Sequence, residues 1–168
     1  MLTGLTASLF TSKQEHVKYD AVEASSIYVV NAQHRSFAWG SSPRLLQNAF
    51  GKTKISKEPD EVLDGNAYTY KYNGLEVYFN EKNCESILVT KPAYQVILNK
   101  AVYKIGDPVN KIRSAFPLSF QHRNTESHHS GWVYIGITSK KQFMDSNVAI
   151  TYNQAGIITE ILIANDNS

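Results

Sequence analysis

The chain has 168 residues, of which 42% are hydrophobic, 11% aromatic and 19% charged, and its formal net charge is +2. This length allows one ordinary domain or two small ones, the composition excludes wholesale disorder, and so small a net charge does not predict a nucleic-acid partner. A single cysteine, Cys84, excludes a disulfide framework and a Cys-rich zinc site, and no apolar run reaches the roughly 18 residues of a membrane-spanning helix.

Residues 1–26 form an N-terminal segment ahead of the first clear element. Its start, MLTGLTASLF, is similar to the apolar part of a secretory signal but lacks basic residues and a small-residue cleavage site. Leu2, Leu5 and Leu9 at helical spacing favour a short docking segment instead. We therefore expect a cytoplasmic protein, or a periplasmic one if residues 1–10 are the end of a signal peptide.

The next stretch predicts a hairpin followed by a helix. Strands are expected at residues 27–30 and 35–39, and the helix is capped by Ser41 or Ser42, has Pro43 at its first position and ends at Gly51. Three strands follow, at residues 68–72, 75–80 and 84–90, and the Asn-Gly between the first two is typical of a tight hairpin turn.

The second part of the chain predicts the same order of elements. A hairpin at residues 95–98 and 101–105 precedes a helix with Asp107 as its cap, Pro108 at its first position and Pro117 as its stop. Strands at 132–138, 148–153 and 157–164 follow, with a long turn after the first of them.

The two parts also match residue by residue. An offset of 66 places Gly106 on Gly40 and Tyr103 on Phe37, and it aligns the Ala-Phe pairs that end the two helices. This pattern predicts two fused repeats, at residues 27–91 and 92–168, each a hairpin, a helix and an antiparallel meander. The fold class expected is α+β, with the helices packed on one face of an antiparallel sheet.

Alternation along the strands predicts which side chains lie inside. Leu75, Val77 and Phe79 share one face, and Tyr68, Tyr70 and Tyr72 are also expected to point inward. Helices on one face leave the other face open, and the aromatic residues expected there are Tyr78, Trp132 and Tyr134. Exposed aromatics on a rigid sheet are typical of protein-binding surfaces, although they also suit strands for structural reasons.

The two Gly, cap and helix stretches, residues 38–51 and 104–116, carry a resemblance. The tandem unit is similar to the β-lactamase inhibitor proteins, to the SmpA/OmlA-type envelope lipoproteins and, nearest, to bacterial tandem-repeat proteins. The resemblance implies non-catalytic protein binding. The chain departs from these families because one cysteine cannot form the inhibitors' disulfides and no lipobox cysteine follows the N-terminal apolar stretch.

A search for catalytic motifs finds no nucleophile elbow, P-loop or dinucleotide fingerprint. Cys84 is expected to be a small buried hydrophobe, and the acidic run around Pro59 a solvated loop. The histidines His122, His128 and His129 lie in a polar loop. They could ligate zinc or copper or form a pH-sensitive contact, but their spacing fits no metal-binding pattern.

The sequence therefore predicts a non-enzymatic module without a cofactor. It binds another protein, in an inhibitor, immunity or envelope-accessory role, through an open aromatic sheet face. The alternative is a small-ligand or metal-binding protein that uses the loop at residues 121–132.

Overall fold

The structure is a computed structural model that describes residues 19–60, 65–81, 83–125 and 130–165, and in these residues the chain is mostly β with a few short helices. One sheet has eight strands in the order β1-β10-β11-β12-β7-β6-β5-β4, and the other has four in the order β3-β2-β8-β9. The strands are β1 (Ala21–Glu23), β2 (Ile27–Asn31), β3 (Ser36–Ala38), β4 (Lys54–Asp60), β5 (Gly65–Tyr72), β6 (Leu75–Asn80), β7 (Asn83–Val89), β8 (Tyr94–Leu98), β9 (Ala101–Lys104), β10 (Ser130–Ser139), β11 (Gln142–Asn153) and β12 (Ile158–Asn165).

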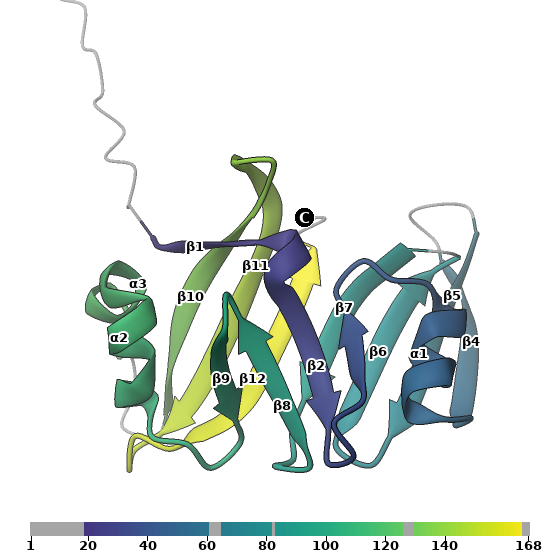
Figure 1. Ribbon diagram of the computed structural model, residues 1–168, viewed down its shortest axis with the longest axis horizontal. Helices are drawn as coiled ribbons and strands as arrows, with labels where there is room; N and C mark the ends of the chain where they lie inside the picture. The colour runs from purple at the N-terminus through teal and green to yellow at the C-terminus, as the bar shows by residue number, and fades with distance from the viewer. Residues whose placement is uncertain (1–18, 61–64, 82, 126–129, 166–168) are drawn as a thin grey trace, which may run out of the picture.

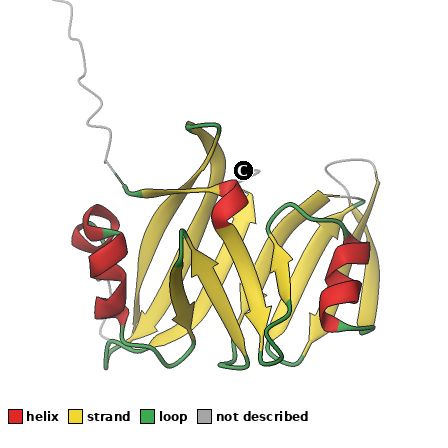
Figure 2. Ribbon diagram, in the orientation of Figure 1, coloured by secondary structure: helices red, strands yellow, loops and turns green. Residues whose placement is uncertain are grey.

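The two sheets form two layers. Figure 1 shows the four-stranded sheet on one side of the eight-stranded sheet, with α1 (Pro43–Phe50) at one flank and α2 (Ile112–Ala115) and α3 (Pro117–Gln121) at the other. Figure 2 shows how small the helical part is beside the strands. The expected α+β class is thus correct in outline, but a second sheet, more than the helices, covers the larger sheet.

The core lies between the sheets, where the alternation predicted it. Leu75, Val77 and Phe79 of β6 are at most 1% exposed, and so are the alternate residues of β10. From the smaller sheet, Ile27 and Val29 of β2 and two residues of β8 point into the same cluster. Apolar side chains at every second position bury one face of each strand, and this burial is the main favourable term holding the layers together.

The hairpins form as predicted, and their first strands join them. β2 pairs antiparallel with β3, β8 pairs antiparallel with β9, and β2 also pairs antiparallel with β8. In the larger sheet β7 pairs antiparallel with β12, the last strand of the other meander. In the smaller sheet the two hairpins therefore extend outward from the central pair of strands in the same order, β2-β3 on one side and β8-β9 on the other. In the larger sheet the two meanders extend outward in the same way, as β7-β6-β5 and β12-β11-β10, and the outermost strands, β4 and β1, do not correspond.

The first helix is confirmed. α1 begins with Pro43 after the cap residue Ser42, whose side chain makes no capping hydrogen bond, and it ends at Gly51 with a φ of +87°. A residue with a side chain is strained at that φ, so glycine is favoured there. The buried Leu46 and the half-buried Ala49 and Phe50 attach the helix to the core.

The second helix was predicted wrongly in its details. Pro108 caps a 3-10 turn, Val109–Lys111, which runs into α2, and Pro117 begins α3 where a stop was expected. The Asp107 carboxylate binds the Lys104 amide and the Lys111 ammonium group, not a helix amide. Proline is compatible with the first turn of a helix as well as with its end, so the sequence pattern was ambiguous.

Three strand features were not foreseen. β4 is rich in charged residues and contains Pro59, which is tolerated because β4 is an edge strand. β1 lies in the expected N-terminal segment and pairs parallel with β10. The expected long turn after β10 is a tight one: Lys140 and Lys141 have φ values of 51° and 65°, and β11 starts directly at Gln142.

Candidate interaction surface

The outer face of the eight-stranded sheet lies opposite the four-stranded sheet and the helices. The strand register aligns one apolar residue from each of four adjacent strands along this face: Tyr134 lies beside Ala149, Ala149 beside Leu162, and Leu162 beside Leu88. We call these four residues the outer apolar row. None of them belongs to the core between the sheets.

Two of the predicted aromatic residues meet at one end of this row. The rings of Trp132 and Tyr134 on β10 are 6.4 Å apart in an edge-to-face arrangement. Tyr134 is 40% exposed and Trp132 is half-buried. This pair forms a rigid, partly exposed aromatic surface of the kind that protein interfaces favour.

Tyr78 lies on the same face but not in the same patch. It is half-buried on β6, and its register partner on β7 is Ser86. β11, β12 and β7 separate β6 from β10, which corresponds to about 19 Å at the usual spacing between strands. The three predicted residues thus share a face, but only Trp132 and Tyr134 are in contact.

Sequence reasoning missed most of the apolar residues on this face. Leu88 and Leu162 become neighbours only when β7 pairs with β12. Phe143 is 71% exposed on β11, and a Cβ placed on Gly136 would lie 2.8 Å from its ring, so the ring rests on the glycine of the next strand. The sequence analysis placed a long turn after β10 and began the next strand at residue 148, so Phe143 was not assigned to a strand.

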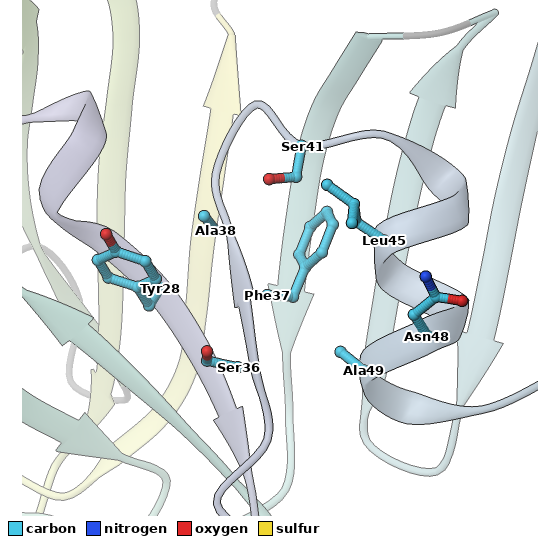
Figure 3. Close-up of a pocket in the computed structure, with 8 residues that line it drawn as sticks. All are labelled: Tyr28, Ser36, Phe37, Ala38, Ser41, Leu45, Asn48 and Ala49. Atoms are coloured by element: carbon cyan, nitrogen blue, oxygen red, sulfur yellow. The ribbon is translucent and has the colours of Figure 1, made fainter.

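A groove of about 380 Å³ lies on the other side of the molecule, between β3 and α1 (Figure 3). The buried Phe37 forms its floor, and Leu45, which is 52% exposed, stands at its α1 wall. It is lined by Tyr28, Ser36, Phe37, Ala38, Ser41, Leu45, Asn48 and Ala49. Its lining is mainly apolar with a few hydroxyl and amide groups, and its size is within the range of binding sites for small ligands.

A second groove, of about 460 Å³, lies beside α2 and α3. Arg113 and Arg123 contribute two positive charges to its lining. The Arg123 guanidinium lies 4.2 Å from the centre of the Phe120 ring and donates a hydrogen bond to the Phe120 carbonyl, so this side chain is already engaged.

The groups with raised pKa values do not line either groove. Burial raises the pKa of Tyr72, Tyr103 and Cys84 to about 12 in each case. Tyr103 and Cys84 belong to the core, and Tyr72 packs against it. Cys84 is therefore a buried hydrophobe, as predicted. The Glu23 carboxylate has a lowered pKa, because the Lys140 amide and the Thr138 hydroxyl donate to it.

The predicted metal ligands are only partly visible. His122 is exposed just after α3, and His128 and His129 lie outside the described residues. Within the part of the chain that the structure describes, no three His, Cys, Asp or Glu side chains are grouped as metal ligands.

Comparison with known proteins gives no relatives: no family model, no curated protein and no solved structure matches the chain. Among the described residues, no helix is long and apolar enough to cross a membrane.

Proposed function

We propose that this chain is a non-catalytic protein-binding module whose contact surface is the outer face of the eight-stranded sheet. The observation that carries the proposal is the outer apolar row, continued at one end by Trp132 and Phe143. A contiguous apolar patch on a protein surface is typical of an interaction site. The partner is expected to be a folded protein with a complementary apolar patch.

Polar residues border this row, as they border many interfaces. Lys71 and Glu76 are register partners beside Leu88, and Glu160 lies across from Thr151 at the other side. An apolar centre with a charged rim excludes water from the contact while the rim selects the partner. The strands hold these side chains on a rigid surface, which lowers the entropy lost on binding.

We also infer that the two halves of the chain, residues 27–91 and 92–168, arose by duplication. Phe37 and Tyr103, which the offset of 66 aligns, are both buried and both contact the aromatic residue at the end of the helical segment, Phe50 or Phe116. The order of strands outward from β2/β8 supports the same inference. It agrees with the resemblance to the β-lactamase inhibitor proteins and the bacterial tandem-repeat proteins, which is itself a proposal.

Photo-crosslinking in the native cells tests the proposed surface. With p-benzoylphenylalanine in place of Tyr134, we expect one dominant adduct with another protein. The matched control carries the same photo-reactive residue at Leu118, an exposed apolar position on α3. We expect Leu162→Lys to remove the adduct at position 134. The proposal is wrong if neither site gives an adduct, or if both sites give the same ones.

The alternative function, small-ligand or metal binding by the loop at residues 121–132, needs a separate test. Titration of the protein with Zn²⁺ in a calorimeter, with His122→Ala as the control, distinguishes it. A saturable site that the variant loses would favour the alternative over the module.

A further inference from the structure

The two hairpins differ at their outer edges. In β9 the Lys104 amide points away from β8 and donates to the Asp107 carboxylate at 3.1 Å, and the same oxygen accepts from the Lys111 ammonium group at 2.8 Å. The offset of 66 places Ala38 at the position of Lys104, Ser41 at that of Asp107 and Leu45 at that of Lys111. The side-chain bridge that closes one edge is therefore absent from the other.

The edge of β3 is consequently open. Hydrogen bonds join the backbones of Asn31 and Arg35 and of Ile27 and Trp39, so in an antiparallel ladder Ser36 and Ala38 direct their backbone groups away from β2. The Ala38 carbonyl accepts from the Ser41 amide at 3.1 Å, which leaves the Ser36 amide and carbonyl and the Ala38 amide at the edge. Among the described residues, no strand pairs with β3 on that side. The open edge faces the groove, where Ser36, Ala38, Ser41 and Leu45 all contribute to the lining (Figure 3).

Charge is also unevenly distributed along the chain segment that forms this groove. Residues 24–57 hold five of the 17 Lys and Arg residues and none of the 15 Asp and Glu residues, so twelve cations and 15 anions remain for the rest of the chain. Arg35 directly precedes β3, and Arg44 directly precedes Leu45 on α1. In the described part of the chain none of these five cations forms a salt bridge, although the Lys57 ammonium group lies 5.8 Å from the centre of the Tyr68 ring. The charges of Arg35 and Arg44, next to lining residues of the groove, are therefore available to an anionic ligand.

We propose that the groove between β3 and α1 binds a short, acidic, extended segment of a partner protein, which adds to the free edge of β3. Unpaired backbone groups provide the hydrogen bonds for such strand addition, and an apolar pocket beside the edge accepts alternate side chains. The acidic side chains would face the cationic segment at residues 24–57. This site is separate from the outer face of the eight-stranded sheet, so either proposal can fail without the other.

Fluorescence anisotropy with a labelled Glu-Val-Glu-Val-Glu-Val-Glu peptide tests the proposal. We expect saturable binding, and we expect Ser41→Asp/Leu45→Lys to weaken it by about tenfold or more, because this variant transfers the closing bridge of β9 onto β3. The double substitution leaves the net charge unchanged. The reciprocal variant, Asp107→Ser/Lys111→Leu, is the matched control and should change the affinity by less than about twofold, because it lies at the other edge.

A second variant and a second readout guard against a folding defect. Ala38→Pro removes the amide that points into the groove without removing a bond of the β2–β3 ladder, and it should also abolish peptide binding. In hydrogen exchange of the wild-type protein, the peptide should slow exchange at the Ala38 amide.

Three results would overturn the proposal. The first is no saturable binding of the peptide to the wild-type protein. The second is equal binding of a peptide N-methylated at every residue, which cannot donate any backbone hydrogen bond to β3. The third is equally tight binding of an oligouridylate that the double variant does not weaken, which would identify a general polyanion site.

Discussion

The two halves of the chain, residues 27–89 and 94–165, both contain a hairpin, a helical segment and a strand meander. They differ in what lies beside the helical segment. In the first half α1 is one regular helix, set apart from β3 by an apolar groove. In the second half the helical region is divided into three short segments, and a salt bridge between Lys111 and Asp107 lies at the corresponding place. The comparison shows that both halves bury an aromatic residue against the end of the helical segment, while the groups beside the exposed strand edge differ.

The largest expected effect concerns the position that both halves share. Phe37 is 2% exposed and its ring contacts those of Phe50 and Phe79, at 6.4 and 6.3 Å between ring centres. Phe37→Ala leaves a cavity at this junction and should lower the free energy of unfolding by about 3–5 kcal/mol. Urea denaturation measures this loss. A loss no larger than that of an exposed-site control, Leu118→Ala, would contradict the assigned packing.

The next largest effect is a loss of stability that we expect in the second half of the chain but not at the aligned position in the first half. The Asp107 carboxylate is mostly buried and accepts hydrogen bonds from the Lys104 amide and the Lys111 ammonium group. We expect Asp107→Ala to lower the free energy of unfolding by about 2 kcal/mol, because it removes two hydrogen bonds to a charged acceptor. Ser41→Ala, at the aligned position, should change it by less than about 0.5 kcal/mol. Equal losses in both variants would show that the edges do not differ.

Alkaline pH tests the buried phenols of both halves. The pKa values of Tyr72 and Tyr103 are raised to about 12, whereas in the unfolded chain a tyrosine titrates near its ordinary value of 10.0. The neutral phenols therefore contribute stability in full below pH 10, and this contribution is lost as the pH rises from 10 to 12. Cys84, whose ordinary value is 9.0, starts the same loss about one pH unit earlier.

Urea midpoints measured at pH 8, 10 and 11 should therefore fall, and Tyr72→Phe and Tyr103→Phe should each reduce the fall. A fall that neither variant changes would mean that other groups dominate alkaline unfolding.

A smaller effect distinguishes Tyr103 from its counterpart Phe37. The Tyr103 hydroxyl is buried and has no hydrogen-bond partner among the described residues, and Phe37 carries no hydroxyl at all. Tyr103→Phe should raise the free energy of unfolding by about 1 kcal/mol at pH 7, because an unsatisfied polar group leaves the core. A clear destabilisation in thermal or urea unfolding would show that the hydroxyl has a partner, such as a buried water.

The smallest effect is expected on the outer face. Tyr134→Ser should change the stability by less than about 0.5 kcal/mol, because the ring is 40% exposed and lies outside the core. The same variant should lose the proposed partner. A large loss of stability would instead assign Tyr134 a structural role.

Much of the candidate surface could not be predicted from the sequence, because it depends on which strands are neighbours. Alternation placed Trp132 and Tyr134 on one face, which is a local property of β10. The contact between Leu162 and Leu88 depends on the pairing of β12 with β7, which are far apart in the chain. The separation of Tyr78 from Tyr134 has the same origin, and so does the groove, which needs α1 to lie beside β3.

The sequence by itself determined the local structure: both hairpins, the first helix, the inward residues of the central strands and the aligned pair Phe37 and Tyr103. These features follow from turn residues, caps and alternation, which act over a few residues. Only the tertiary structure decided that the hairpins join into a second sheet, that the polar segment at β4 becomes an edge strand, and that one edge is closed by Asp107 while the other is open. Such outcomes depend on which strands pair over long distances in the chain. Each strand can form backbone hydrogen bonds with several others, and the local sequence pattern does not specify which pairing forms.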